Sequence, residues 1–228
     1  MTTETKKISI FLDLDQTLIS SEVSKEHNFK KYNNKSTKFN FYNMDDLYLV
    51  FSRPHLQFFL TYLFDNFNVS IWTAATKDYA IFIIDNLIKL NHPERKINHI
   101  LYSYHCDIST NITGNSKDLS ILNSTFLLSQ YNIINTIILD DNYEVHSSQP
   151  DNCIIAQPFY FTNTNSENDT FLLQLIPKLQ ELQIQIIKNQ SLQIQNINNT
   201  LSKSLVIESL QSSNKEKAIS RKRNKKIN

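Results

Sequence analysis

Short apolar runs alternate along the chain with longer segments of helical periodicity. Such short runs predict buried strands at residues 8–12, 69–72, 100–106 and 136–140. Segments whose apolar residues recur every three or four positions predict helices after Ser52-Arg53-Pro54, over residues 77–90 and over residues 169–183. Because strands and helices alternate, the pattern predicts a three-layer α/β domain with a mostly parallel sheet.

The predicted helices have identifiable starts and inward faces. Ser52 is a candidate N-cap of the first helix, and Pro54 suits its first turn. Pro177 lies inside the apolar stripe of the last helix and predicts a kink or a break. The apolar stripes of the first two helices consist of Leu56, Phe59, Leu60, Leu63 and Phe64, then of Ala80, Ile83, Ile84, Leu87 and Ile88.

The segment between the first strand and the first helix is polar. Residues 20–43 predict a long loop with a strand near residues 39–42, and a second strand at residues 47–51 follows a turn at residues 44–46. A long loop beside a catalytic edge is often a flap that faces the substrate, and a solvated insertion is an equal alternative.

Length and composition narrow the class of protein. The 228 residues suffice for one α/β domain at 1–185 and a polar, partly helical or disordered tail at 186–228. The net charge of +1 gives no general case for binding to nucleic acid or membranes, and Gly114 as the single glycine excludes glycine-rich nucleotide loops. Neither a signal peptide nor a run of about 20 apolar residues is present, so we expect an intracellular protein without a membrane span.

The tail has two features of its own. Ile194, Ile197, Leu201 and Leu205 recur with helical spacing, which predicts an amphipathic helix. The cluster Arg221–Lys226 is basic. Such clusters are typical of nuclear-import signals or nucleic-acid contacts, and a solvated tail is an equal alternative.

Acidic residues follow two of the buried strands. Asp13 and Asp15 come after residues 8–12 and point the same way in an extended segment, with Thr17 next. Asp140 and Asp141, then Asn142, end the strand at residues 136–140. Because buried carboxylates need a counter-charge, we expect both acidic pairs to meet at one edge of the sheet around Mg²⁺. The alternative is acidic turns without a ligand.

Two further residues are candidates for contacts with a phosphoryl group. The Thr73 hydroxyl, with nearby backbone N–H groups, would bind a phosphoryl oxygen at the start of the second helix. Lys117 would supply a fixed positive charge beside the carboxylates. A surface lysine and a strand that ends in threonine are the simpler interpretations.

These segments, in this order, resemble motifs of the haloacid dehalogenase superfamily. They resemble phosphatases of the RNA polymerase II C-terminal-domain (CTD) type, which include the small CTD phosphatases, dullard and NLI-interacting-factor-like proteins. The resemblance spans residues 7–185 and rests on Asp13–Ile19, Arg53-Pro54, Trp72-Thr73-Ala74, Lys117–Ser120, Asp140-Asp141 and the segment from His146 to Pro158. One departure is Ser103, which stands where the family usually has an arginine.

The resemblance implies a haloacid-dehalogenase (Rossmann-like) fold without a large cap domain. It also implies a Mg²⁺-dependent phosphatase that acts on phosphoserine or phosphothreonine in proteins. Asp13 would be the nucleophile and Asp15 the general acid and base, while Thr73 and Lys117 stabilise charge. The metal would be held by the Asp13 carboxylate, the Asp15 carbonyl and Asp141, and Thr17, Asp140 and Asn142 are additional candidates.

Two other functions remain open at this level. One is a catalytically weak or inactive phosphatase-like scaffold, for example in virus capsid assembly, which the loss of the arginine at Ser103 favours. The other is a phosphatase of lipids or small molecules, because the sequence Asp-x-Asp-x-Thr also occurs in lipid phosphatases.

Overall fold

A five-stranded parallel sheet forms the centre of the molecule. The structure is a computed structural model that describes residues 7–24, 34–187 and 197–203. The sheet has the order β6-β5-β1-β7-β8 and every pairing in it is parallel. Its strands are β1 (Ser9–Leu12), β5 (Asn68–Trp72), β6 (Ile100–Leu101), β7 (Thr136–Asp140) and β8 (Cys153–Ile155). The prediction of a mostly parallel α/β fold is confirmed.

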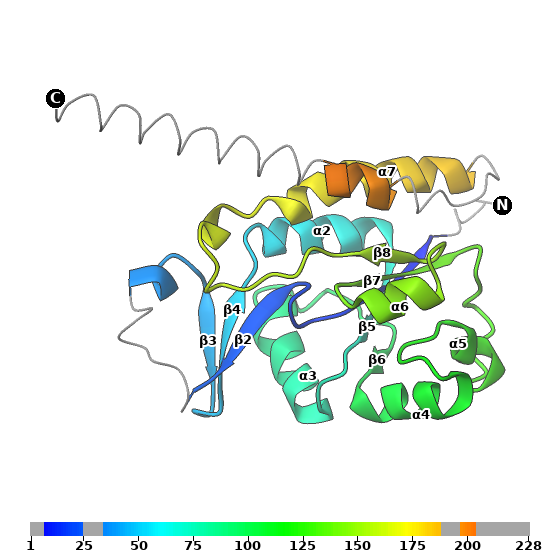
Figure 1. Cartoon of the computed structure of the whole chain (residues 1–228), viewed down its shortest axis with the longest axis horizontal. Coiled ribbons are helices and arrows are strands. Elements are labelled where there is room, and N and C mark those ends of the chain that lie inside the picture. The colour runs from blue at the N-terminus through cyan, green and yellow to red at the C-terminus, as the bar shows by residue number, and fades with distance from the viewer. Residues whose placement is uncertain (1–6, 25–33, 188–196, 204–228) are drawn as a thin grey trace, which may run out of the picture.

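Helices cover both faces of this sheet. Ile10 and Leu12 of β1 belong to a core shared with α2, α3 and α7, whereas Phe11 packs with residues of α4, α5 and α6. This division follows from the alternation of side chains along a strand. Figure 1 shows α2 and α7 together on one side, with α4 and α5 on the other. The helices are α2 (Leu56–Asn66), α3 (Lys77–Ile83), α4 (Ser103–Thr113), α5 (Ser120–Ser124), α6 (Tyr143–Ser148) and α7 (Phe171–Ile187).

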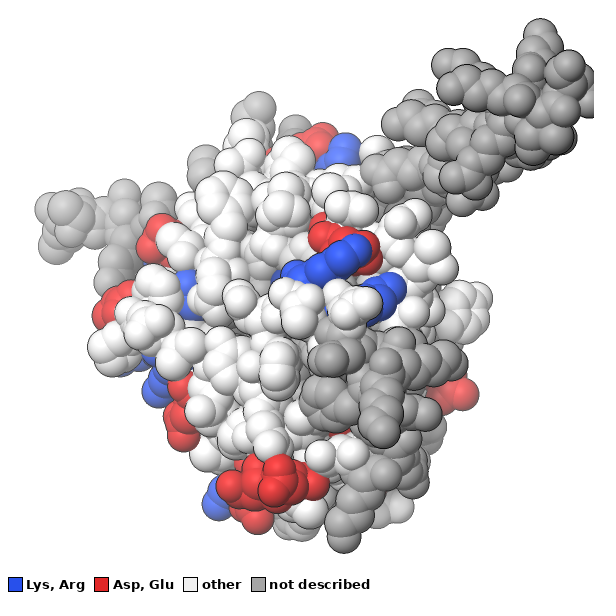
Figure 2. Space-filling model, turned by 90° about the vertical axis from the view of Figure 1, so that its left-hand side faces the viewer, with Lys and Arg blue, Asp and Glu red and all other residues white. Residues whose placement is uncertain are grey.

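A smaller antiparallel sheet stands beside the central one. It consists of β2 (Ile19–Val23), β4 (Tyr48–Ser52) and β3 (Phe41–Met44) in that spatial order. The prediction of a continuous loop from residue 20 is therefore wrong at its start, because residues 19–23 pair with β4. Figure 2 shows this side of the molecule, where the described surface is mostly uncharged apart from separate groups of basic and acidic residues. A compact apolar cluster anchors this sheet and consists of Phe39, Leu49, Phe51, Phe159 and Phe161.

Two predicted boundaries are wrong. The strand expected at residues 100–106 ends at Leu101, because the chain leaves the sheet and α4 begins at Ser103. The His105 ring accepts a hydrogen bond from the Tyr102 N–H at 3.1 Å, which closes the first turn of that helix. Ser52 does not cap α2 either, since it is the last residue of β4 and the N-cap position is occupied by His55.

The remaining helix predictions hold with one modification each. The segment predicted at residues 77–90 is α3 followed by a π-helical turn, η1 (Ile84–Ile88), and all five predicted inward residues are buried. A 3₁₀ turn, η2 (Ser166–Asn168), precedes α7. The helix α7 runs through Pro177 without a break, although a proline lacks the N–H for one helical hydrogen bond.

Part of the segment predicted as a tail contacts the domain. Residues 197–203 are helical, and Ile197 and Leu201 are buried against the main core. The Asn198 side chain accepts from the Ile155 N–H at 3.1 Å and donates to the Cys153 carbonyl at 3.1 Å, so it pairs with β8. The cluster at residues 221–226 lies outside the described residues. Among the described helices, none is long and apolar enough to cross a membrane.

Candidate functional site

The acidic ends of β1 and β7 lie side by side. These strands pair in parallel with Leu12 opposite Leu139, and the Asp13 N–H donates to the Leu139 carbonyl at 3.0 Å. The next residues along the two strands are therefore neighbours. Asp13, Asp140 and Asp141 each place one carboxylate oxygen within 4.8 Å of the others. The expected convergence therefore holds for three of the four carboxylates, and the Asp15 carboxylate is not part of this group.

Lys117 reaches this acidic group from the loop between α4 and α5. Its Nζ donates to Asp13 Oδ1 at 2.6 Å and to Asp140 Oδ2 at 2.7 Å, and its side chain is 5% exposed. The backbone at Lys117 is left-handed, with φ of 59°. The Gln149 side chain holds this turn, because it donates to the Lys117 carbonyl at 2.8 Å and accepts from the Leu119 N–H at 3.0 Å.

The charges of this group suit a divalent cation. Three carboxylates and one ammonium give a formal charge of −3 + 1 = −2 when all four groups are ionised. One divalent cation would neutralise that excess, and carboxylate oxygens are the ligands that Mg²⁺ prefers. The donor set therefore fits the metal that the sequence predicts.

The protonation equilibria of the group lead to the same conclusion. Burial and then the charge of Asp13 raise the pKa of Asp141 to about 6, and they also raise the pKa of Asp140. Burial lowers the pKa of Lys117, but the charges of Asp13 and Asp140 outweigh burial and raise that pKa overall. The Lys117 ammonium therefore stays charged, whereas the ionised forms of Asp140 and Asp141 are disfavoured. A bound cation would relieve this excess of negative charge.

The raised pKa of Asp141 predicts how stability changes with pH. A carboxyl group whose pKa is higher in the folded than in the unfolded state binds its proton more tightly in the folded state, which stabilises the fold. For Asp141 this stabilisation is complete at pH values below the unfolded pKa of 3.8, and it is lost as the pH rises through the folded pKa of about 6. Without metal, Asp141→Asn should therefore melt at a higher temperature than the unmodified protein at pH 7 and close to it at pH 5. Thermal denaturation in EDTA measures the difference.

Magnesium provides the matching control. It should raise the melting temperature of the unmodified protein more at pH 7 than at pH 5, because the metal binds only the deprotonated carboxylates. The rise should be smaller in Asp141→Asn, which has lost a negative ligand. An equal gap between the two proteins at both pH values in EDTA would contradict the assigned cause.

Asp15 lies apart from the three converging carboxylates. Its Oδ1 accepts hydrogen bonds from Ser21 Oγ at 2.8 Å and from Tyr79 Oη at 2.7 Å. Burial raises the pKa of Asp15, the two hydroxyl donors lower it, and the Asp13 charge raises it further, with a net rise. Asp15 is therefore easier to protonate than an ordinary aspartate, as a general acid requires.

The other predicted site residues surround the same edge of the sheet. Thr73 directly follows β5, which pairs with β1 on the side opposite β7, and its hydroxyl accepts from the Ala75 N–H at 3.1 Å. That contact uses an acceptor of the hydroxyl and does not need its O–H donor. Thr17 Oγ1 donates to Asp141 Oδ1 at 3.4 Å. Asn142 accepts from the Glu144 N–H and caps α6, so its side chain has a local structural partner.

Ser103 occupies the start of α4 at the same edge. Its N–H donates to the Ala75 carbonyl at 2.9 Å, which places it beside the loop that carries Thr73. A serine side chain is short and neutral. This position therefore supplies no guanidinium for a phosphate, in agreement with the departure noted in the sequence.

Sequence patterns did not reveal three of the residues that hold this site. Ser21, Tyr79 and Gln149 contact Asp15 or the Lys117 turn only through tertiary structure. Ser21 lies in a segment predicted as loop, and Tyr79 is a buried residue of an amphipathic helix. Neither position carries a sequence signal of its own. Gln149 lies in the segment from His146 to Pro158, and that family resemblance was its single signal.

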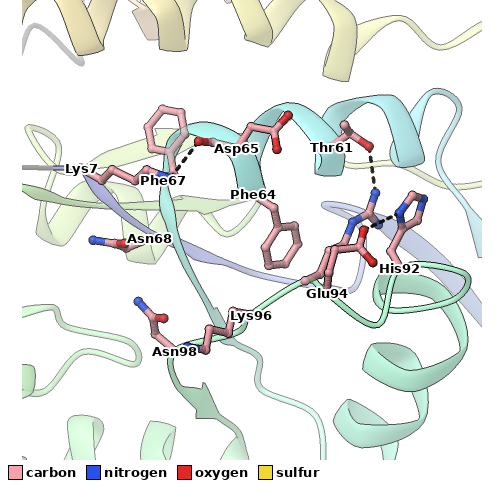
Figure 3. A pocket seen from close by; sticks show the side chains of 11 residues that line it. Lys7, Thr61, Phe64, Asp65, Phe67, Asn68, His92, Glu94, Lys96 and Asn98 are labelled. Carbon is pink, nitrogen blue, oxygen red and sulfur yellow. Dashed lines mark hydrogen bonds and ion pairs between the residues drawn. The ribbon is translucent and has the colours of Figure 1, made fainter. Parts of the chain in front are cut away.

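A separate cavity lies at the opposite end of the sheet. It measures about 360 Å³ and is lined by residues that include Lys7, Asn68 and Asn98 (Figure 3). Lys7 precedes β1 and Asn68 begins β5, so this cavity is at the edge where the strands start. Lys7 Nζ donates to the Asp65 carbonyl at 2.8 Å, and the cavity lining carries both positive and negative groups.

Comparison with known proteins gives one consistent family. The model of the NLI interacting factor-like phosphatase family matches residues 8–191. The chain is 44% identical over 171 residues to CTD phosphatase-like protein 355R of Invertebrate iridescent virus 6. This alignment covers 73% of this chain and 94% of the relative. It is 33% identical over 181 residues to CTD small phosphatase-like protein 2 of Dictyostelium discoideum. That alignment covers 77% of this chain and 27% of the relative.

A solved structure has the same fold. The structure of the fission yeast RNA polymerase II CTD phosphatase Fcp1-R271A bound to beryllium fluoride matches with a TM-score of 0.52 and 16% identity. The match covers 92% of this chain and 66% of that one. At this identity the likeness concerns the arrangement of helices and strands.

Proposed function

Because the chain belongs to the NLI interacting factor-like phosphatase family, we propose that it is a Mg²⁺-dependent protein serine/threonine phosphatase. The observation that carries the proposal is the group formed by Asp13, Asp140, Asp141 and Lys117 at the carboxyl edge of the sheet. Ligands of open α/β sheets bind at this edge. The group combines a candidate nucleophile, a candidate metal site and a fixed positive charge.

The proposed reaction has two steps. In the first step, an Asp13 carboxylate oxygen attacks phosphorus, the bond from phosphorus to the serine or threonine oxygen breaks, and Asp15 gives its proton to that oxygen. In the second step, Asp15 takes a proton from water as the water oxygen attacks phosphorus. The bond between phosphorus and Asp13 then breaks, which releases phosphate and restores both carboxyl groups.

Other residues would stabilise the charge on the transferred group. Lys117 is held within hydrogen-bonding distance of Asp13, so its ammonium lies where phosphoryl oxygens would gather. Thr73 would donate its O–H to one of those oxygens. Asp13, Asp141 and the Asp15 carbonyl would hold Mg²⁺, which would neutralise negative charge on the phosphoryl oxygens.

The surroundings of the site favour a large substrate. The described chain between the motifs forms the small β2-β4-β3 sheet and short helices, without a separate cap domain over the site. The described part of the face that carries this sheet is mostly uncharged, with separate groups of basic and acidic residues (Figure 2). A phosphorylated peptide segment of a protein fits an open edge of this kind better than a small enclosed metabolite.

A substrate panel tests this function. The purified chain should hydrolyse p-nitrophenyl phosphate with Mg²⁺ and lose that activity in EDTA. With phosphoserine and phosphothreonine peptides, kcat/KM should exceed the value for phosphatidate in mixed micelles. Equal activity with and without EDTA would contradict the metal assignment. Faster turnover of phosphatidate would contradict the protein substrate.

One second candidate has a specific observation in its favour. A scaffold that binds phosphoproteins with little turnover is favoured by Ser103, which cannot pair with a phosphate as an arginine would. The panel above separates the two functions, since a scaffold would bind a phosphopeptide in a fluorescence-anisotropy titration without releasing phosphate.

A further inference from the structure

The carboxyl group of Asp15 is fixed by two hydroxyl groups from separate parts of the fold. We propose that Ser21 and Tyr79 are positioning residues that hold one oxygen of Asp15, so that the other oxygen passes the proton to the leaving group. The inference rests on the proposed function, because it concerns the proton transfer of the first step. Neither residue would touch the reacting atoms itself.

The geometry separates the two oxygens of Asp15. Ser21 Oγ and Tyr79 Oη both donate to Oδ1, at 2.8 and 2.7 Å. Two donors on one oxygen fix the plane and direction of the carboxyl group. They also make Oδ1 a poor place for a proton, because an added hydrogen would meet two O–H donors. The proton therefore belongs on Oδ2, the oxygen that neither hydroxyl occupies.

Both donors are themselves held in place. Ser21 lies in β2 and pairs with Val50 of β4, so its position depends on the small sheet. Tyr79 lies in the first turn of α3 and is 5% exposed. Its ring packs edge to face on Tyr48 of β4, with ring centroids 5.4 Å apart. The general acid is thus braced from the small sheet on one side and from a helix of the main domain on the other.

This arrangement has a distinctive kinetic consequence. An alkoxide such as that of serine is a poor leaving group and needs a proton while its bond to phosphorus breaks. The p-nitrophenolate ion leaves readily without one. The value of kcat/KM reports on the steps up to loss of the leaving group. A misplaced general acid should therefore lower kcat/KM for a phosphoserine peptide much more than for an aryl phosphate. General destabilisation of the fold would slow both substrates by the same factor.

Two substitutions test the inference by independent routes. Tyr79→Phe and Ser21→Ala each remove one hydroxyl and leave the rest of the side chain nearly unchanged. Each should lower kcat/KM for a phosphoserine peptide at least about tenfold, and lower it less than about threefold for p-nitrophenyl phosphate. Ser21→Thr keeps a hydroxyl, so it should retain most of the kcat/KM for the phosphoserine peptide that Ser21→Ala loses.

A matched control is Tyr62→Phe. It removes a tyrosine hydroxyl that donates to Gln183 at 2.9 Å between α2 and α7, away from the site. Its kcat/KM should be unchanged for both substrates. The inference is overturned if Tyr79→Phe or Ser21→Ala lowers kcat/KM for both substrates by the same factor. It is also overturned if either variant leaves kcat/KM unchanged for both substrates. If the unmodified protein turns over neither substrate, the proposed function itself fails. The two failures are therefore distinguishable, and the two variants give separate tests.

Discussion

Asp13→Asn is expected to lower kcat/KM for p-nitrophenyl phosphate at least about 10⁴-fold, because an amide oxygen cannot act as the nucleophile. The fold should survive, since asparagine has the same shape and still offers an acceptor to Lys117. Lys117 also keeps its contact with Asp140 at 2.7 Å. Steady-state kinetics with Mg²⁺, together with a circular dichroism melt, measure both parts of this prediction.

The control for this substitution is Asp107→Asn. Asp107 is an exposed residue of α4, so the same chemical change there should leave turnover within about twofold of the unmodified protein. Retention of more than about a tenth of the activity in Asp13→Asn would remove Asp13 from the role of nucleophile. A general acid or a metal ligand alone would then have to account for its place in the site.

Arg53→Met is expected to cause the largest loss of stability, about 3–5 kcal/mol in the free energy of unfolding. The Arg53 side chain is fully buried and forms a two-pronged ion pair with Asp169, through bonds of 3.0 and 2.9 Å. It also donates to the carbonyls of Thr17 and Gln157 at 2.9 Å each. Methionine would leave a carboxylate and two carbonyls without these donors.

The same substitution should disturb the site as well as the fold. Thr17 lies in the turn that follows Asp13 and Asp15, and Asp169 accepts from the Phe171 N–H where α7 begins. The guanidinium also lies over the Phe171 ring, 4.4 Å from its centroid. Arg53 therefore connects the first acidic turn to the last helix. Urea-induced unfolding measures the change in stability.

A surface ion pair offers the matched control for Arg53. Lys38 pairs with Glu167, and its side chain is 54% exposed, so Lys38→Met removes a largely solvated cation while Lys35 stays 3.9 Å from Glu167. Exposed pairs contribute under about 1 kcal/mol, and the control should stay within that limit. An effect of Arg53→Met no larger than that of Lys38→Met would show that the buried ion pair does not stabilise the fold.

The acidic centre is the part of the site that was most visible in the sequence. Asp13 and Asp140 each follow directly on a buried β-branched run, and the carboxyl ends of parallel strands meet at one edge. Only local patterns and this general rule were needed. The family motif around Lys117 added the cation, whose position no periodicity indicates, because a lysine in a turn is usually solvated.

The boundaries that the sequence misplaced depend on contacts between distant segments. Residues 19–23 become a strand because β4 pairs with them, although their own composition is polar. The pairing of β6 with β5 ends at Leu101 opposite Trp72, and from Ser103 the chain is helical, with the His105 ring accepting from the Tyr102 N–H in the first turn of α4. Local propensity decides neither outcome.

The amino-acid sequence alone determined the α/β class, the inward faces of the helices and the meeting of two acidic strand ends, because each follows from spacing between near neighbours. Tertiary structure alone decided which side chains brace those acids. Ser21 and Tyr79 hold Asp15 from 6 and 64 residues away, and Arg53 joins Thr17 to Asp169 across more than 100 residues. A hydrogen bond between remote side chains depends on the packed backbone, and no pattern along the chain encodes its distance or direction.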